Sequence, residues 1–281
     1  MVGFAKPRRV EDGRGPCKRF PGALTWSISG EYPFAVLRLE VLGSGDAFNA
    51  CGALHSCYLL EHSAGSLMME CGPSVLAGLQ RAGIDPNKPD VLLISHLHGD
   101  HFGGVPFMYL EYMFRTVRDR PLVIAGPKTI EDRVMQLYRA LYSEIERRHP
   151  LRFEVVFVEL EAGRSAELAG ARIEPFLVPH SAEPYSLGYR IETPDGAVLF
   201  SGDSAWTEEF VERSRGTKLF LCECCSMSRQ SDMHTSYENI LANRERLGCE
   251  RLLLTHLGTD VRESDAVEEQ RAHDGLILEL D

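Results

Sequence analysis

The residues best suited to chemistry lie in the segment "SHLHGDHFGG" at positions 95–104. His96, His98, Asp100 and His101 follow the apolar run "DVLLIS" directly. Four such groups would be costly to desolvate together without a compensating cation. Imidazole and carboxylate together suit Zn²⁺, Mn²⁺ or Fe²⁺. The segment therefore predicts a divalent metal site at the end of a buried strand.

The spacing in this segment divides the four groups into two pairs. Because a strand alternates its faces, His96 and His98 are expected to point the same way. Gly99 would permit a tight turn, after which Asp100 and His101 can face a second point. We expect two adjacent ligand groups, one built from nitrogen alone and one from nitrogen and oxygen.

Three further polar residues follow apolar runs, in the setting where α/β proteins collect their sites. His180 follows "IEPFLVP", Asp203 follows "AVLFSG" and His256 follows "RLLLT". Together with the first segment they make five histidines and two aspartates. That is about the number of protein ligands that two divalent ions sharing a water require.

Strands and helices alternate along the chain and have to position these residues. Apolar runs bounded by Gly, Pro or Asp predict strands at 36–42, 56–61, 67–70, 91–95, 122–125, 153–158, 172–178, 185–192, 197–201, 219–223, 251–255 and 276–280. "TPDGA" at 193–197 predicts a hairpin turn. Nothing repeats at a solenoid period, so we expect one α/β domain over residues 35–281. Residues 1–34, rich in Pro, Gly and Arg, are expected to form a loosely ordered N-terminal extension.

Two helices stand out. The segment after "GPKT" predicts a helix with an apolar stripe of Ile130, Val134, Leu137, Leu141 and Ile145. The segment "GVPFMYLEYMFRTV" is apolar on two sides, which indicates a helix that is buried twice. Its second face could be core alone, or it could be a subunit interface. We expect a homodimer, with this second face as the candidate interface.

Charge and composition limit the class of protein. The 281-residue chain carries a formal charge of −11, which argues against broad binding to nucleic acid or anionic membranes. No apolar run has the length of a membrane span or the pattern of a signal peptide, so we expect a cytoplasmic protein. We expect a small-molecule or short-nucleotide substrate. Cys222, Cys224 and Cys225 are interpreted as small hydrophobes of a buried strand, with a redox or metal role as the alternative.

The pattern H-x-H-x-D-H at 96–101, followed by His180, Asp203 and His256, resembles the metallo-β-lactamase superfamily of hydrolases. The resemblance covers residues 36–260 and implies a four-layer αββα sandwich with two mixed sheets and helices outside. It also implies two metal ions, zinc or else manganese or iron. One would take His96, His98 and His180, the other Asp100, His101 and His256, and Asp203 would bridge them.

Within the superfamily the sequence is similar to the phosphodiesterases related to tRNase Z. "LGSGDAFNACGALHSCYLL" resembles their Gly-rich loop, "IAGP" their Gly-Pro step, and "FLCECCSM" with "HTSYENI" their Glu-then-His pair. On that match Glu223 orients His234, which protonates the leaving oxygen or stabilises the scissile phosphate. The residues alone leave His234 open as a proton donor or a helix-flanking surface residue. The implied catalytic set is His234, Glu223 and Asp100.

Two departures from the tRNA-processing enzymes refine this prediction. Only a short hairpin separates His180 from Asp203, where those enzymes carry a long arm, and Glu70 stands where an Asp is common. The layout is more similar to small cyclic phosphodiesterases, without their cysteine zinc site. We therefore predict a dinuclear hydrolase of small or cyclic phosphodiesters rather than tRNA precursors. Thioester, lactone or aryl sulfate hydrolysis, and an iron-dependent persulfide dioxygenase, are the alternatives.

Overall fold

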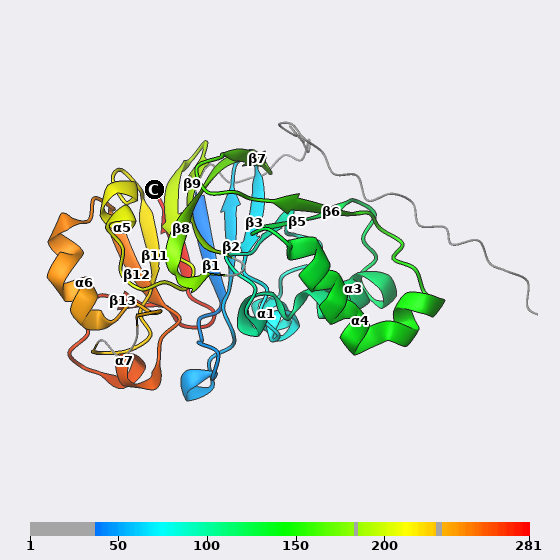
Figure 1. The fold of residues 1–281 in the computed structure, drawn as a ribbon, viewed down its shortest axis with the longest axis horizontal. Coiled ribbons are helices and arrows are strands. Elements are labelled where there is room, and N and C mark those ends of the chain that lie inside the picture. Colours follow the sequence, from blue (N-terminus) through cyan, green and yellow to red (C-terminus); the bar gives the residue numbers. More distant parts are fainter. Residues whose placement is uncertain (1–36, 183–184, 229–231) are drawn as a thin grey trace, which may run out of the picture.

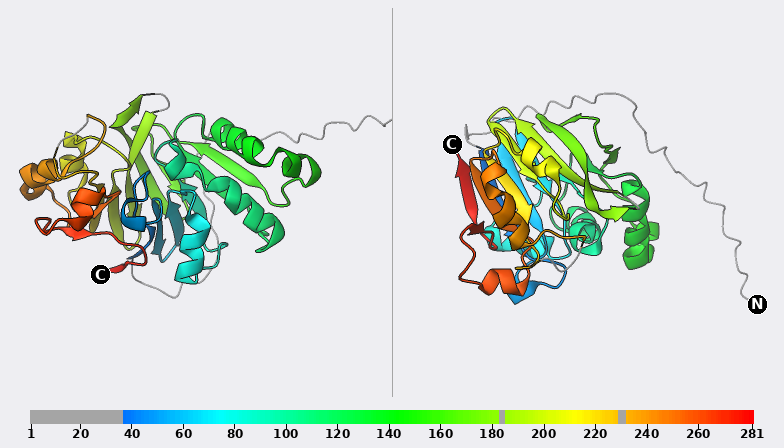
Figure 2. Two further views of the ribbon diagram at one scale, coloured as in Figure 1. Left: turned by 90° about the horizontal axis from the view of Figure 1, so that it is seen from below. Right: turned by 60° about the vertical axis from the view of Figure 1, so that its left-hand side comes forward.

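The computed structural model describes residues 37–182, 185–228 and 232–281. The predicted N-terminal extension, residues 1–34, lies outside the described residues. The described chain forms two seven-stranded sheets that face each other, with helices on both outer sides (Figure 1, Figure 2). This is the predicted four-layer α/β arrangement.

The first sheet is mixed and has the strand order β14-β1-β2-β3-β4-β5-β6. Its antiparallel part runs from β14 to β3, and β3 to β6 are parallel. The strands are β1 (Leu37–Gly43), β2 (Cys57–His62), β3 (Gly65–Met69), β4 (Val91–Leu93), β5 (Leu122–Gly126), β6 (Val155–Glu159) and β14 (Ile277–Leu280).

The second sheet has the order β13-β12-β11-β10-β9-β8-β7. Strands β7 to β10 are antiparallel, whereas β10 to β13 are parallel, so the latter end at the same edge. The strands are β7 (Ala166–Leu168), β8 (Ala171–Ala182), β9 (Tyr185–Thr193), β10 (Gly196–Phe200), β11 (Leu219–Glu223), β12 (Arg251–Thr255) and β13 (Gln270–Arg271).

The helices cover the outer faces of both sheets. Leu79, Met108 and Val134, from three helices, pack with residues of the first sheet. On the second sheet Phe210 and Ile240 have the same role. The helices are α1 (Val75–Ala82), α2 (Gly99–Phe102), α3 (Val105–Phe114), α4 (Ile130–Arg148), α5 (Glu208–Arg213), α6 (Tyr237–Asn243) and α7 (Thr259–Glu263), with the 3₁₀ turns η1 (Ala50–Gly52) and η2 (Arg244–Arg246).

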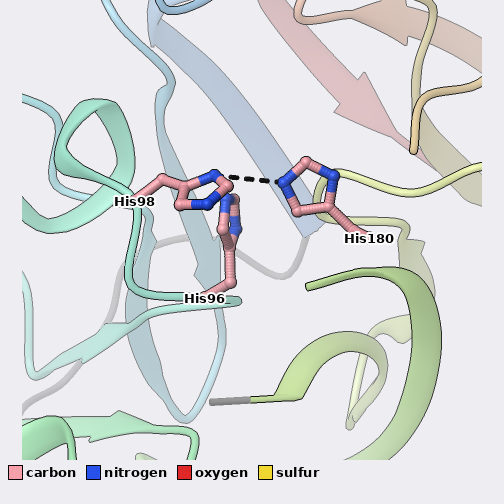
Figure 3. A group of neighbouring side chains, drawn as sticks. All are labelled: His96, His98 and His180. Atoms are coloured by element: carbon pink, nitrogen blue, oxygen red, sulfur yellow. Dashed lines mark hydrogen bonds between the residues drawn. The ribbon is translucent and has the colours of Figure 1, made fainter. Parts of the chain in front are cut away.

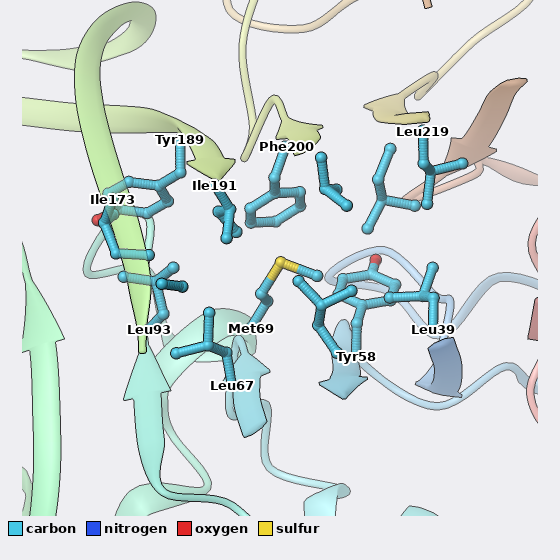
Figure 4. Close-up of a cluster of buried hydrophobic side chains, with 14 of the residues drawn as sticks. Leu39, Tyr58, Leu67, Met69, Leu93, Ile173, Tyr189, Ile191, Phe200 and Leu219 are labelled. Atoms are coloured by element: carbon cyan, nitrogen blue, oxygen red, sulfur yellow. The ribbon is translucent and has the colours of Figure 1, made fainter. Parts of the chain in front are cut away.

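The main hydrophobic core lies between the two sheets (Figure 4). Leu39 and Met69 of the first sheet face Phe200 and Leu219 of the second, and all four are buried. Burial of one such side chain contributes about 1.5–3 kcal/mol to stability. The core holds the two sheets together at the edge where the polar residues collect.

The predicted strands are all present, although their bounds differ by a few residues. Strand β4 ends at Leu93, two residues before the expected end, and the short strands β7 and β13 were not predicted. The stripe predicted for α4 is only partly right, because Tyr138 is buried and Leu141 is 48% exposed. In the parts of the chain that the structure describes, no helix combines the length and apolarity needed to cross a membrane.

Candidate metal centre

All seven predicted ligands come together at one edge of the sandwich. His96 and His98 lie in the connection between β4 and α2, not in the strand itself, whereas Asp100 and His101 lie in α2. The parallel register of β10, β11 and β12 brings their carboxyl ends side by side. Asp203 follows β10 and His256 follows β12. Residues far apart in sequence thus meet because the strands that carry them end together.

His180 reaches this edge through an irregularity in β8. The pairing of β8 with β9 shifts its register between Val178 and Ala182, so His180 lies within the shifted segment. A bulge of this kind bends a strand and re-aims its side chains. The ring nitrogen Nδ1 of His180 lies 2.8 Å from the carbonyl oxygen of Met233, which fixes the ring and leaves Nε2 to face the site.

We call His96, His98 and His180 the first ligand group. One nitrogen from each ring lies within 4.8 Å of the other two. The Nε2 atom of His180 is 3.1 Å from Nδ1 of His98. Figure 3 shows the three rings converging from the two sides of the site. Three imidazoles so placed match the nitrogen-only group that the sequence predicts.

We call Asp100, His101 and His256 the second ligand group. Oδ2 of Asp100 lies 3.1 Å from Nε2 of His101 and 3.4 Å from Nε2 of His256. The rings of His101 and His256 stack at a centroid distance of 5.3 Å. The second group therefore combines nitrogen and oxygen ligands, again as predicted.

Asp203 lies between the two groups. Its Oδ2 atom is 3.2 Å from His101 and 3.3 Å from His256, and also 3.9 Å from His96 and 4.0 Å from His180. One buried carboxylate oxygen thus faces nitrogens of both groups. This is the position that a bridging ligand requires.

The donor set fits two divalent cations. The Nε2 atom of His96 is buried without a hydrogen-bond partner, and Nε2 of His101 is buried facing two carboxylate oxygens without a well-formed hydrogen bond. Orphaned buried polar atoms are rare because they lose their bonds to water without compensation. A metal ion would satisfy those that face the site, and nitrogen with carboxylate oxygen is a donor set that zinc, manganese and iron accept.

The charge of the site is distributed unevenly. Burial lowers the pKa of His96 and of His180. The Asp203 carboxylate acts to raise both pKa values but does not offset the effect of burial. Burial also acts to lower the pKa of His101 and of His256, but neighbouring carboxylates, Asp203 first, outweigh it and raise both. The second ligand group therefore sits in the more negative environment and attracts positive charge more strongly.

Groups behind the ligands hold them in place. The sequence patterns did not predict these supporting roles. The hydroxyl of Ser95 lies 2.9 Å from Nδ1 of His96. The fully buried Glu70 lies 3.6 Å from Nδ1 of His101 and accepts a hydrogen bond from the backbone N–H of Ser95. Such outer partners fix ring orientation and tautomer. The signal for Glu70 is a carboxylate directly after the apolar strand "SLMM".

His234 and Glu223 form a pair beside the ligands. Nδ1 of His234 lies 3.0 Å from Oε2 of Glu223, which is buried at the end of β11. The His234 ring stacks on His256 and contacts His180 edge-on, at centroid distances of 5.9 and 4.8 Å. Burial acts to lower the pKa of His234, but Glu223 outweighs it, so the pKa lies above its ordinary value. The geometry therefore favours the proton-donor interpretation over a surface histidine.

The backbone at two of these positions is strained. His256 has a φ of 51° and Glu70 a φ of 62°, in the left-handed region that residues other than glycine rarely adopt. Strain of this kind costs about 1–3 kcal/mol and persists where the surrounding structure determines it. Both residues lie at ends of strands that lead to the centre.

The cysteine cluster takes no part in the centre. Cys222 and Cys224 are buried in the core beneath α5 and α6, as the interpretation as small hydrophobes predicts. Burial raises the pKa of the Cys222 and Cys224 thiols, which makes them unreactive. Cys225 is half-buried, and burial raises the pKa of its thiol to about 12.

The fold is that of metallo-β-lactamase-fold proteins. YhfI of Bacillus subtilis, a protein of that fold, superposes with a TM-score of 0.67 at 19% identity, over 86% of this chain and 99% of its own. A diphosphatase of the PhnP family superposes with a TM-score of 0.68 at 21% identity, over 87% and 98%. At these identities the likeness concerns the fold.

The sequence identifies the family more closely. Residues 37–277 match the family of the anti-Pycsar protein Apyc1, and the chain belongs to that family. An uncharacterized protein of Mycobacterium leprae is 30% identical over 265 residues, which cover 92% of this chain and 88% of the relative. A ribonuclease Z of Agathobacter rectalis is 25% identical over 260 residues, 73% of this chain and 82% of that enzyme.

Proposed function

We propose that the protein is a dinuclear, metal-dependent phosphodiesterase that hydrolyses small or cyclic phosphodiesters. The observation that carries the proposal is the His234–Glu223 pair, which stands against ligands of both groups. The thiolate or phenolate that leaves a thioester or an aryl sulfate needs a proton donor less than the alkoxide that leaves most phosphodiesters, so the pair favours phosphodiesters over these two alternatives. The names of relatives, a ribonuclease Z and a diphosphatase, agree with chemistry on phosphate.

We assign the ligands as the resemblance to the superfamily implies. His96, His98 and His180 would hold one ion, the second ligand group the other, and Asp203 would bridge. Two divalent ions of zinc, or of manganese or iron, would lower the pKa of a shared water toward about 7 and neutralise charge in the transition state.

The proposed role of His234 follows from its contacts. Glu223 accepts a hydrogen bond from Nδ1–H, so the other nitrogen, Nε2, is free to carry a proton toward the substrate. The backbone N–H of Ser204 holds the other oxygen of Glu223, which keeps the carboxylate in place. His234 then donates a proton to the leaving oxygen as general acid. Asp100, the remaining member of the proposed catalytic set, acts through its place in the second ligand group.

The connection between His180 and Asp203 supports a small substrate. It consists of the end of β8 with strands β9 and β10, which the tight turn at Thr193–Gly196 joins as predicted. Among the described residues, no long arm projects there to hold a folded RNA. The net charge of −11 also disfavours stable binding to a polyanion.

The test combines metal analysis with a substrate panel. The zinc-loaded protein is assayed on bis-p-nitrophenyl phosphate, a cyclic nucleotide, a thioester and an aryl sulfate, in the wild type and in His234→Ala. We expect turnover of both phosphodiesters. In His234→Ala the cyclic nucleotide, whose alkoxide leaving group needs a proton, should be hydrolysed about 10²–10⁴-fold more slowly while two ions stay bound, and bis-p-nitrophenyl phosphate should be affected less. His149→Ala, at an exposed position after α4, is the matched control. Full phosphodiester turnover in His234→Ala, or preference for the thioester, would contradict the proposal.

We also propose a homodimer. The outer face of α3 carries half-buried Phe107 and Leu110 and exposed Phe114, which line a groove with Leu76 of α1. The double substitution Phe107→Glu and Phe114→Glu should halve the native mass, whereas Ile277→Glu on β14 should not. An unchanged native mass in the double variant would contradict a subunit interface at this face.

We place the enzyme in the cytoplasm. The seven cysteines among the described residues are all free thiols, as in a reducing compartment.

A further inference from the structure

The loop between β1 and β2 carries an exposed aromatic side chain that nothing described so far uses. Phe48 is 90% exposed, more than any other large hydrophobic side chain in the described parts of the chain. The loop contains η1 and projects below the sheets as the blue segment of Figure 1. An exposed ring on a mobile loop carries little information. This loop is fixed by hydrogen bonds, and its base adjoins the second ligand group.

Hydrogen bonds fix the conformation of this loop. The carboxylate of Asp46 accepts from the backbone N–H groups of Phe48 and Ala50. The side-chain amide of Asn49 donates to the carbonyl of Ala53, and Asn49 itself has a left-handed φ of 53°. A carboxylate at the start of a turn that satisfies two amides sets the turn geometry. Phe48 is thereby presented outward in a defined direction.

The base of the loop is joined to the second ligand group. Gly45 forms bridges both with His55 and with Leu257, the neighbour of the ligand His256. Arg262 of α7 donates to the carbonyl oxygens of Ser44 and Leu257, so it clamps the start of the loop to the same segment. Figure 2 agrees with Figure 1 in placing the loop beside α7.

The other end of the loop meets the second group as well. A Cβ atom on Gly72 would lie 2.5 Å from Cβ of His55 and 2.4 Å from the carbonyl oxygen of Asp100. The chain after the loop and the ligand segment are therefore in close approach. Since three residues of chain span at most about 10 Å, the backbone of Phe48 lies within about that distance of Gly45, whose bridge partner Leu257 adjoins the ligand His256. Phe48 is therefore on the side of the molecule where a nucleotide with its phosphate at the centre would extend its base.

We propose that Phe48 is a specificity residue that stacks on the base of a nucleotide substrate bound at the metal centre. The inference rests on the proposed function and deepens it, because it names the residue that would contact the base of a nucleotide substrate. A π-face accepts any base, so the contact favours nucleotides over phosphodiesters without a base and does not select one base strongly. The uncharged ring also avoids repelling the phosphate.

The first arm of the test measures binding. Full-length, zinc-loaded protein is titrated calorimetrically with a nucleoside 5′-monophosphate and with ribose 5-phosphate. We expect Phe48→Ala to weaken binding of the nucleotide by about tenfold and to leave ribose phosphate unchanged. Phe48→Trp should restore nucleotide binding, and Ile277→Ala, an exposed hydrophobe on β14, should change neither.

The second arm measures kinetics on a cyclic nucleotide and on a cyclic ribose phosphate without a base. Phe48→Ala should raise KM for the nucleotide by about tenfold while kcat and the metal content stay the same. Equal effects on both compounds, or none, would overturn the inference. A change in native mass would assign Phe48 to a subunit contact and overturn it too. If the wild type turns over neither compound, the proposed function is wrong, and the binding arm still decides the role of Phe48.

Discussion

The two ligand groups differ in what stands behind them. His96 and His180 of the first group are backed by neutral oxygens, the Ser95 hydroxyl and the Met233 carbonyl. In the second group the buried carboxylate of Glu70 backs His101, and that of Glu223 lies 3.9 Å from Nδ1 of His256. A carboxylate partner makes an imidazole a more basic ligand than a neutral partner does.

This difference has a consequence for metal binding. The second ligand group has an oxygen ligand of its own and additional negative charge behind it, so it should hold its ion more tightly. The first group shares only the Asp203 carboxylate. We therefore expect two sites of unequal affinity joined by one bridging residue.

The largest effect is expected from removal of the bridge. Asp203→Ala takes a charged ligand from both groups, so activity should fall by more than the 10–100-fold that loss of an outer partner typically causes. Metal analysis should find fewer than two ions in the variant. Asp85→Ala, an exposed aspartate before β4, serves as control. Unchanged metal content in Asp203→Ala would rule out the bridging role.

The next experiment compares one ligand from each group. His98→Ala should keep one tightly held ion at the second group, whereas His256→Ala should keep one weakly held ion at the first. Titration with a chelator, with metal release followed spectroscopically, measures the difference. We expect the ion in His98→Ala to require the higher chelator concentration. The reverse order would show that backing carboxylates do not set the affinities here.

An intermediate effect is expected from the buried carboxylate behind His101. Glu70→Gln keeps the shape and removes the charge, and metal affinity or activity should fall by about 10–100-fold. Glu111→Gln on α3 is a matched control, because that carboxylate is also buried and bonds the hydroxyl of Thr116 instead. Glu70→Asp should lie between Gln and the wild type. Equal losses of metal affinity or activity in Glu70→Gln and Glu111→Gln would point to a general effect on folding.

The meeting of the seven polar side chains at one edge could be predicted from sequence because each has a local signature. His180, Asp203 and His256 follow apolar runs, and strands of one sheet that end at one edge bring such residues together. The pattern at 96–101 is too dense in costly polar groups to be structural alone. Fold class followed from the alternation of strands and helices, which reflects burial and is visible in any core strand.

Other features depend on contacts that no local pattern encodes. Gly99 was expected to permit a tight turn, yet its φ is not left-handed and no atom lies near its absent Cβ. A Cβ would instead clash at Gly103 and at Gly104, where it would lie 2.2 Å from the carbonyl oxygen of Gly72. This neighbour of Gly104 comes from a different strand end. Likewise α4 departs from helical geometry at Tyr142, and Leu141 beside it is exposed, which the regular stripe could not anticipate.

The smallest effect is expected from the neutral partner in the first group. Ser95→Ala removes the hydroxyl 2.9 Å from Nδ1 of His96 and leaves the ring buried. A neutral hydrogen bond contributes about 0.5–1.5 kcal/mol net, so the affinity for the first ion should fall by about two- to tenfold. The ion at the second group should be unaffected, as chelator titration of Ser95→Ala can show. Equal losses of metal affinity in Ser95→Ala and Glu70→Gln would show that a neutral partner supports its ligand as strongly as a charged one. The two groups would then differ only in their direct ligands.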